Sequence, residues 1–137
     1  MSKRTGYSGK PLYQKLGIKE EHQSMIIDEP ESFMEWLEMP FGLNSLKEGS
    51  NADYIHIFVI QKKLLEVYLK QARALMQQNG MIWVSWPKKA AKVPTDMSED
   101  VVRQLAFPLD LVDVKVCSVS DVWSGLKLMI RKEKRIS

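Results

Sequence analysis

The chain of 137 residues is long enough for one domain with a substantial core, and 45% hydrophobic with 27% charged residues is typical of a soluble globular protein. The single cysteine, Cys117, excludes an internal disulfide and favours a reducing, cytoplasmic location. The chain has no apolar signal core and no run of roughly 18 apolar residues, so we expect no membrane association.

The net charge of +3 is weak and is concentrated at the two ends of the chain. Residues 1–9 contain two glycines and predict a flexible N-terminal arm. We place a single domain at residues 10–132 and a basic tail at residues 133–137. Basic tails can attract nucleic acid, but they are also common solubilising ends, and we expect no nucleic-acid partner.

The first half of the chain predicts short elements separated by turns. Pro11 is typical of a helix start and Gly17 of a helix end. In chain order we predict a helix at residues 11–16, a strand at 24–28, a helix at 31–38 and a loop at 42–53.

The middle of the chain has the strongest pattern. Residues 54–60 are almost all β-branched, aromatic or otherwise apolar, which predicts a strand buried on both faces. Apolar side chains then repeat at helical spacing from Leu64 to Met76, and Asn79-Gly80 predicts the end of that helix. Residues 81–85 predict a second buried strand.

The last third predicts one helix and a hairpin. Asp96 and Glu99 match a capping box at the start of a helix that ends before Pro108. Residues 112–117 and 126–130 alternate apolar and polar side chains, as paired strands do. Two buried strands joined by a helix indicate a parallel sheet, so we predict one Rossmann-like α/β domain that ends in an antiparallel hairpin.

Residues 53–132 resemble the second half of a class I S-adenosylmethionine-dependent methyltransferase in their order of elements: strand, helix, strand, helix and hairpin. That family has an acidic-Gly-x-Gly-x-Gly turn after its first strand. Here Ile27 is followed by Asp28-Glu29-Pro30-Glu31, which contains no glycine for a close approach of backbone to ligand. We therefore expect no S-adenosylmethionine in the usual mode and predict no cofactor.

Four motifs carry a closer resemblance over nearly the whole chain. They are Gly6-Tyr7-Ser8-Gly9-Lys10-Pro11-Leu12, Trp83-Val84-Ser85-Trp86-Pro87-Lys88-Lys89, Val93-Pro94-Thr95-Asp96 and Trp123-Ser124-Gly125-Leu126-Lys127. Together they resemble a family of small bacterial proteins that is catalogued as a domain of unknown function. The resemblance implies a bacterial source and no particular activity.

The motifs also suggest where a ligand would bind. Ligands of open parallel sheets bind beyond the carboxyl ends of the strands. Lysines beside a helix start there would favour an anion. We therefore predict a ligand face made by Trp86, Lys88, Lys89, Thr95, Asp96, Trp123 and Ser124. Of these, Trp86, Lys88, Lys89 and Trp123 should lie close together and be accessible to solvent.

A plainer interpretation stays open: a solvated basic loop, with Asp96 capping its helix and Trp86 packing over the sheet end. His22 and His56 lack the spaced partners of a metal site or a catalytic triad, so we assign no catalytic residue. We predict a non-enzymatic binding or regulatory module for a small anionic ligand or a partner's acidic segment. A diverged transferase, and weak nucleic-acid binding through the basic ends, are the alternatives.

Overall fold

Two parallel strands in the middle of the chain organise the fold, which is described from a computed structural model over residues 9–136. The strands β3 (Ala52–Phe58) and β4 (Met76–Ser85) pair in parallel. The helix α3 (Lys62–Leu75) crosses between them. The predicted N-terminal arm lies outside the described residues except for Gly9.

The sheet has six strands in the order β2-β1-β3-β4-β6-β5. The strands β1 (Gln23–Ile27) and β2 (Asn44–Ser45) extend the parallel part. On the other side, β6 (Ser124–Ile130) runs antiparallel to β4, and β5 (Leu111–Ser118) runs antiparallel to β6. The predicted Rossmann-like α/β fold with a terminal antiparallel hairpin is confirmed.

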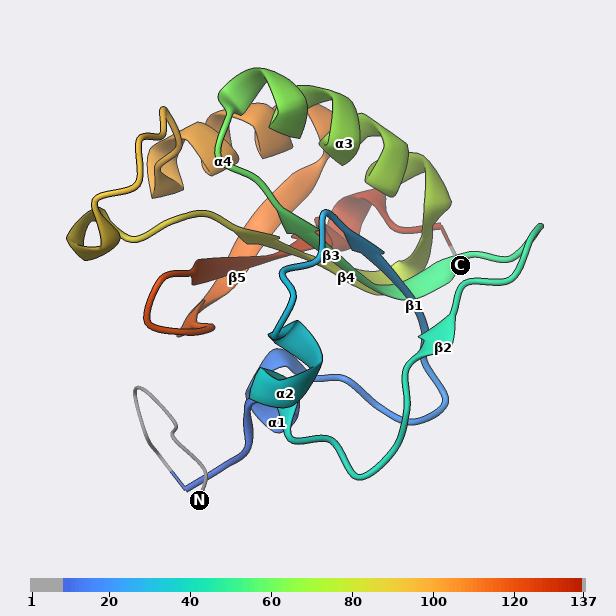
Figure 1. Ribbon diagram of the computed structural model, residues 1–137. Coiled ribbons are helices and arrows are strands. Elements are labelled where there is room, and N and C mark those ends of the chain that lie inside the picture. The colour runs from blue at the N-terminus through green and yellow to red at the C-terminus, as the bar shows by residue number, and fades with distance from the viewer. Residues whose placement is uncertain (1–8, 137) are drawn as a thin grey trace.

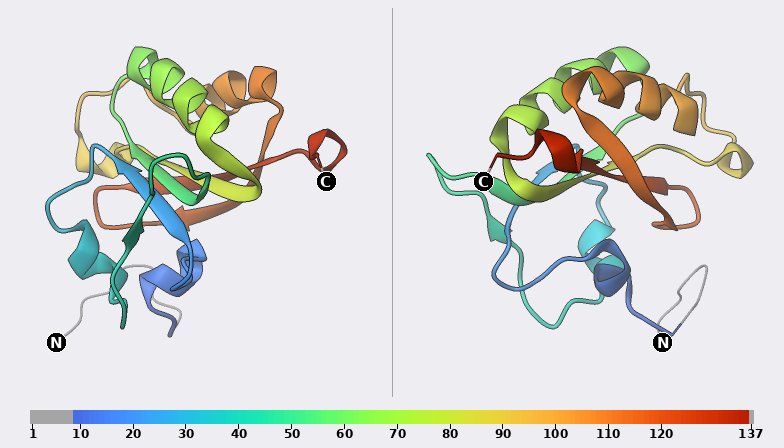
Figure 2. Two further views of the ribbon diagram at one scale, coloured as in Figure 1. Left: turned by 90° about the vertical axis from the view of Figure 1, so that its right-hand side faces the viewer. Right: turned by 180° about the vertical axis from the view of Figure 1, so that it is seen from behind.

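Helices cover both faces of the sheet (Figures 1 and 2). The helices α3 and α4 (Glu99–Ala106) lie on one face, and two short helices, α1 (Leu12–Leu16) and α2 (Phe33–Leu37), lie on the other. Three 3-10 turns complete the structure: η1 (Lys89–Ala91), η2 (Phe107–Leu109) and η3 (Lys132–Lys134).

Each face has its own core. On the α3 side, Leu65, Leu69 and Ala72 form a stripe along the helix and are fully buried against the sheet. On the α1 side, Phe33 and Trp83 are fully buried, and Trp83 donates a 2.9 Å hydrogen bond from Nε1 to the backbone oxygen of Leu16. Each large apolar side chain buried in this way contributes about 1.5–3 kcal/mol.

Two predicted element boundaries are wrong. Residues 42–53 contain β2, whose two residues pair with β1. The helix α3 does not run on to Asn79-Gly80, because β4 begins at Met76, directly after the helix. A side chain at Gly80 would place its Cβ 2.9 Å from the backbone oxygen of Ala52, where the register of β3 and β4 shifts. Glycine is needed there for close strand contact, not for a helix cap.

The predicted end of the first helix is confirmed. Gly17 has a φ of 83° and ends α1 in the left-handed conformation, and its backbone N–H donates to the oxygens of Tyr13 and Gln14. This turn carries the chain toward β1 and brings the helix end close to the β5–β6 hairpin.

At the other end of the chain, the last described residues contact the domain. Arg135 donates a 2.8 Å hydrogen bond from Nε to the backbone oxygen of Ile130, and the backbone N–H of Ile136 donates to Oε1 of Gln78. Within the described residues, no helix has both the length and the apolar composition to cross a membrane.

A polar network is fully buried under α2. The Tyr54 hydroxyl lies 2.6 Å from Nδ1 of His56, and the Ser85 hydroxyl lies 2.8 Å from Nε2. The His56 ring also stacks on Phe58, with ring centroids 4.3 Å apart. Burial lowers the pKa of His56 to about 3, because a charged imidazolium would lose its hydration there. The neutral ring therefore satisfies both hydroxyl partners as one donor and one acceptor.

This network predicts a loss of stability in mild acid. The unfolded state binds a proton at His56 below about pH 6.5, whereas the folded state does not until about pH 3. The free energy of unfolding should therefore fall as the pH drops, by about 1.4 kcal/mol from this residue between about pH 7.5 and pH 5.5. Urea denaturation across that range measures the effect. The loss should persist in His22→Gln and shrink in His56→Gln; an unchanged loss in His56→Gln would contradict the assignment.

Candidate functional site

The chain beyond the end of β4 continues to pair with the start of β6. The backbone N–H of Ser124 donates to the oxygen of Trp86, and that of Lys88 donates to the oxygen of Val122, at 2.9 and 2.7 Å. Pro87 and Trp123 form an isolated antiparallel bridge between these contacts. This pairing brings together two motifs that lie almost forty positions apart.

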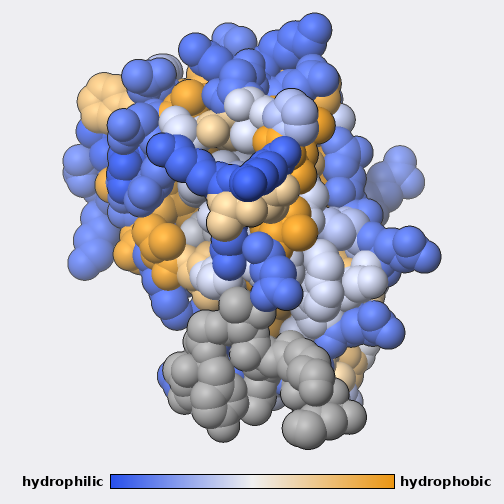
Figure 3. Space-filling view, turned by 60° about the vertical axis from the view of Figure 1, so that its left-hand side comes forward, coloured by the Kyte–Doolittle hydropathy of each residue, from blue (hydrophilic) through white to orange (hydrophobic). Residues whose placement is uncertain are grey.

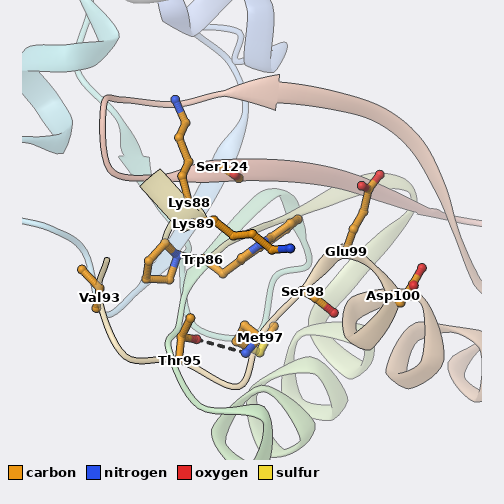
Figure 4. Close-up of a pocket in the computed structure, with 11 residues that line it drawn as sticks. Trp86, Lys88, Lys89, Val93, Thr95, Met97, Ser98, Glu99, Asp100 and Ser124 are labelled. Atoms are coloured by element: carbon orange, nitrogen blue, oxygen red, sulfur yellow. Dashed lines mark hydrogen bonds between the residues drawn. The ribbon is translucent and has the colours of Figure 1, made fainter. Parts of the chain in front are cut away.

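A hollow of about 640 Å³ opens beside this pairing, between η1 and the start of α4 (Figure 4). We call it the Trp86 hollow. It is lined by Trp86, Pro87, Lys88, Lys89, Val93, Thr95, Met97, Ser98, Glu99, Asp100 and Ser124. Five of the seven residues predicted for the ligand face line it: Trp86, Lys88, Lys89, Thr95 and Ser124. Asp96 and Trp123 do not.

The two predicted tryptophans lie on opposite faces of the sheet. Trp86 is only 8% exposed and packs with the core on the α3 side, so the expectation that it is widely accessible is wrong. Trp123 packs on the α1 side, edge-to-face against Phe58 with ring centroids 5.2 Å apart. Trp86 therefore forms the floor of the hollow. Trp123 packs under the β5–β6 hairpin on the other face of the sheet, the α1 side.

The two adjacent lysines also separate. Lys89 is exposed, and its side chain extends across the Trp86 indole (Figure 4). The Lys89 ammonium has no hydrogen-bond or ion-pair partner within residues 9–136. Lys88 points away from the hollow, and its ammonium donates a 2.6 Å hydrogen bond to Oγ of Ser118. Lys89 is therefore the ammonium group available to a ligand in this hollow.

Thr95 and Asp96 hold the loop in place. The Thr95 hydroxyl donates a 2.6 Å hydrogen bond to the oxygen of Ile60 and accepts one from the backbone N–H of Met97. Oδ1 of Asp96 accepts a 2.7 Å hydrogen bond from the backbone N–H of Lys62 at the start of α3. These contacts fasten one wall of the hollow to the helix that precedes it in the chain.

The capping box predicted at Asp96 and Glu99 is wrong. The residue that caps α4 is Ser98, whose hydroxyl accepts a hydrogen bond from the backbone N–H of Val101. Asp96 instead satisfies an N–H of α3, a helix for which no cap was predicted and whose own N-cap residue, Gln61, makes no side-chain cap.

The wall opposite Lys89 is acidic. Glu99 and Asp100 occupy the first turn of α4, where carboxylates favour the helix dipole. Both pair with Arg103, at 2.6 and 3.1 Å. Glu99 and Asp100 were not among the residues predicted for the ligand face. Their position in the first turn of a helix directly after Thr95-Asp96 could have indicated them. The side of the molecule where η1 lies is a mosaic of hydrophilic and hydrophobic side chains (Figure 3).

The turn after β1 does not fit a cofactor that needs close backbone approach. Asp28 adopts a left-handed conformation with a φ of 57°. Its carboxylate is hydrogen-bonded to Tyr68 of α3, and this contact raises the pKa of the tyrosine. Glu29 and Pro30 follow without a glycine. The methionine part of S-adenosylmethionine would therefore meet side chains and a carboxylate cluster at this turn.

The described part of the chain contains no group of three or more His, Cys, Asp or Glu side chains placed to hold a metal ion. Cys117 is half-buried, and burial raises the pKa of its thiol. Neither observation adds a catalytic residue to the Trp86 hollow.

No protein-family model matches the chain, and no curated protein matches it in sequence. The resemblance of its motifs to a bacterial family of unknown function therefore stays a prediction. Solved structures do match its fold. A SAM-dependent methyltransferase from Aquifex aeolicus aligns over 88% of both chains, with a TM-score of 0.56 and 14% identity. The CcbJ methyltransferase from Streptomyces caelestis aligns over 88% of this chain and 87% of its own, with a TM-score of 0.55 and 8% identity.

Other methyltransferases of the same fold are much longer. The magnesium protoporphyrin IX methyltransferase from Synechocystis PCC 6803 matches 67% of this chain with a TM-score of 0.51 and 8% identity, but the match spans only 48% of that enzyme. At such identities the likeness establishes a methyltransferase-like fold and leaves the activity to be decided by the site.

The contact between Asp96 and α3 predicts a measurable stability effect. Asp96→Ala should lower the free energy of unfolding by about 1 kcal/mol, because the N–H of Lys62 loses its capping partner. Asp96→Asn should restore most of the loss, because an asparagine oxygen also accepts at a helix start. Chemical denaturation of both variants, with Glu48→Ala in an exposed turn as a control, tests this. Equal losses in the alanine and asparagine variants would contradict a capping role.

Proposed function

We propose that this protein is a non-enzymatic binding module that holds a small anionic ligand in the Trp86 hollow. The observation that carries the proposal is the Lys89 ammonium, which has no partner within residues 9–136 and extends across a hollow of about 640 Å³ with Trp86 as its floor. A volume of this size lies within the range of about 300–1,000 Å³ common for small-molecule sites.

The charges of the hollow favour an anion. The carboxylates of Glu99 and Asp100 are paired with Arg103, whereas Lys89 has no partner within residues 9–136. A carboxylate or phosphate on the ligand would pair with Lys89. A flat or apolar portion beside it would cover the exposed edge of Trp86 and the side chains of Val93 and Met97.

The hydroxyls around the hollow support binding more than catalysis. The Thr95 and Ser98 side chains are both engaged in backbone hydrogen bonds that hold the wall. None of the lining residues is a histidine or a cysteine, the usual bases and nucleophiles of group transfer. The hollow therefore lacks an evident proton acceptor other than the carboxylates that Arg103 already binds.

A diverged transferase is the second candidate. It is favoured by the likeness to the methyltransferase from Aquifex aeolicus, which extends over nearly all of both chains. The turn after β1 weighs against it, because Asp28 and Pro30 stand where a glycine-rich turn would approach the cofactor.

Lys89 provides the test of the binding proposal. Native mass spectrometry of the protein purified from its own host should show a bound small anion. Lys89→Ala should lose most of that bound mass, because its ammonium pairs with the anion. Lys92→Ala, which removes a lysine outside the lining of the hollow, should keep it. Both variants should unfold within about 0.5 kcal/mol of the wild type. Equal retention by the two variants, or a ligand-free wild type, would count against the hollow.

S-adenosylmethionine provides the test of the alternative. Calorimetric titration to about 1 mM should give no saturable binding, because the close backbone approach that a glycine-rich turn provides is missing after β1. A methyltransferase of the same fold serves as the positive control. Saturable binding in the micromolar range would make the transferase the leading function.

A further inference from the structure

A second concentration of positive charge lies on the α1 side of the hairpin, apart from the Trp86 hollow. Four lysines from four segments contribute to it: Lys15 at the end of α1, Lys88 after β4, Lys115 on β5 and Lys127 on β6. We call these residues the lysine face. Three of them, Lys15, Lys88 and Lys115, act electrostatically on the thiol of Cys117, and their charges lower its pKa against the larger effect of burial.

The centre of the lysine face is a pair of like charges. Lys115 and Lys127 are direct partners in the antiparallel ladder of β5 and β6. Side chains in this relation leave the same face of the sheet, with Cβ atoms about 4.5–5.5 Å apart, and like charges there are destabilising. The pair lies directly after a shift in register between Asp113 and Lys115. An unfavourable pair in a ladder breaks a local rule of sheet design, and such exceptions concentrate at functional positions.

The hydrogen-bond partners of Lys88 and Lys115 do not neutralise their charges. Lys115 donates a 2.9 Å hydrogen bond to the backbone oxygen of Lys15, and Lys88 donates to the Ser118 hydroxyl. Both acceptors are uncharged. Within residues 9–136 no ion pair joins Lys88, Lys115 or Lys127 to a carboxylate, and residues 1–8 contain no Asp or Glu.

Of the lysines in this face, Lys127 has the charge that the described residues compensate least. It is half-buried beside Gly17 and Met81, and a Cβ at Gly17 would lie 3.9 Å from its Nζ. Its ammonium has no hydrogen-bond or ion-pair partner in the described part of the chain. Burial, and then the charge of Lys115, lower its pKa. A partly desolvated ammonium is normally paired, so the missing partner is expected to come from outside the chain.

We propose that the lysine face is a second anion site, which binds a phosphate-type dianion between Lys115 and Lys127. Two ammonium groups on one ladder pair suit a ligand with two negative charges and several acceptor oxygens, whereas a single carboxylate would leave one ammonium unpaired. Lys15 and Lys88 border the site, and the charge of Lys88, whose partner is the uncharged Ser118 hydroxyl, adds attraction. The site is separate from the Trp86 hollow, because its central pair faces the α1 side and the ammonium of Lys88, the one residue common to both, bonds Ser118 and points away from the hollow.

Inorganic pyrophosphate is the probe for this site. At low ionic strength, about 20 mM, calorimetry should show saturable binding, and amide resonances of Gly17, Lys115 and Lys127 should shift in a ¹⁵N spectrum. Lys127→Met keeps the aliphatic stem and removes the charge. It should weaken binding roughly tenfold, the loss expected for one charge-assisted hydrogen bond.

The thermal stability of Lys127→Met is a second measurement, and it distinguishes a lost ligand contact from a damaged fold. Lys127→Met should raise the midpoint of thermal unfolding by about 1–3 °C, because the repulsion with Lys115 and the burial of a charge are both removed. The control is Lys70→Met, on the exposed side of α3, which should leave both binding and stability unchanged. Lys89→Ala should also leave pyrophosphate binding unchanged, so that failure of the Trp86 hollow does not affect this test.

Two further titrations identify the source of the phosphate group. Equal binding of pyrophosphate and a phosphoserine peptide would indicate recognition of the group itself, and tighter binding of the peptide would indicate a phosphorylated protein; both support the site. The proposal is overturned if pyrophosphate does not saturate, or if Lys127→Met and Lys70→Met bind it equally. It is also overturned if only duplex DNA binds, with equal affinity for both variants.

Discussion

The burial of β3 on both faces is the constraint on which the rest of the structure depends. Its alternate side chains, such as Ile55 and Tyr54, must each be covered by a separate layer. One layer is supplied by α3, which is long enough to present a complete apolar stripe. The other is supplied by α1 and α2, which have five residues each and would not be stable alone. Their stability comes from the sheet, through the buried Phe33 and the hydrogen bond from Trp83 to α1.

The sequence pattern predicted the elements whose own side chains determine whether they form a helix or a strand. The apolar side chains of α3 repeat at helical spacing and those of β3 form an almost continuous run, and both elements are present. The two residues of β2 could not be predicted, because that strand exists only through its pairing with β1. The start of β4 was missed because Met76 continues the helical spacing of α3, while the close contact between Gly80 and Ala52 is visible only in the sheet.

In the candidate site, too, contacts between neighbouring residues could be predicted and most contacts between distant residues could not. The motifs around Trp86 and Trp123 were expected to meet, and backbone pairing does bring them together. Their side chains were expected to form one surface, but the two indoles lie on opposite faces of the sheet. Asp96 was assigned to the helix that follows it, whereas it caps a helix that begins 34 residues earlier. Capping patterns read along the chain detect only local partners, so no sequence rule pointed to Lys62.

The separation of Lys88 from Lys89 has a backbone cause with functional consequences. Lys88 is the last extended residue and pairs with Val122, whereas Lys89 begins the η1 turn, so their side chains leave the backbone in different directions. One contiguous basic motif thus contributes to two places, the Trp86 hollow and the lysine face. Both are attached to the same short pairing between the end of β4 and the start of β6. Because the backbone turns between Lys88 and Lys89, the two ammonium groups lie in two separate places and do not form one basic patch.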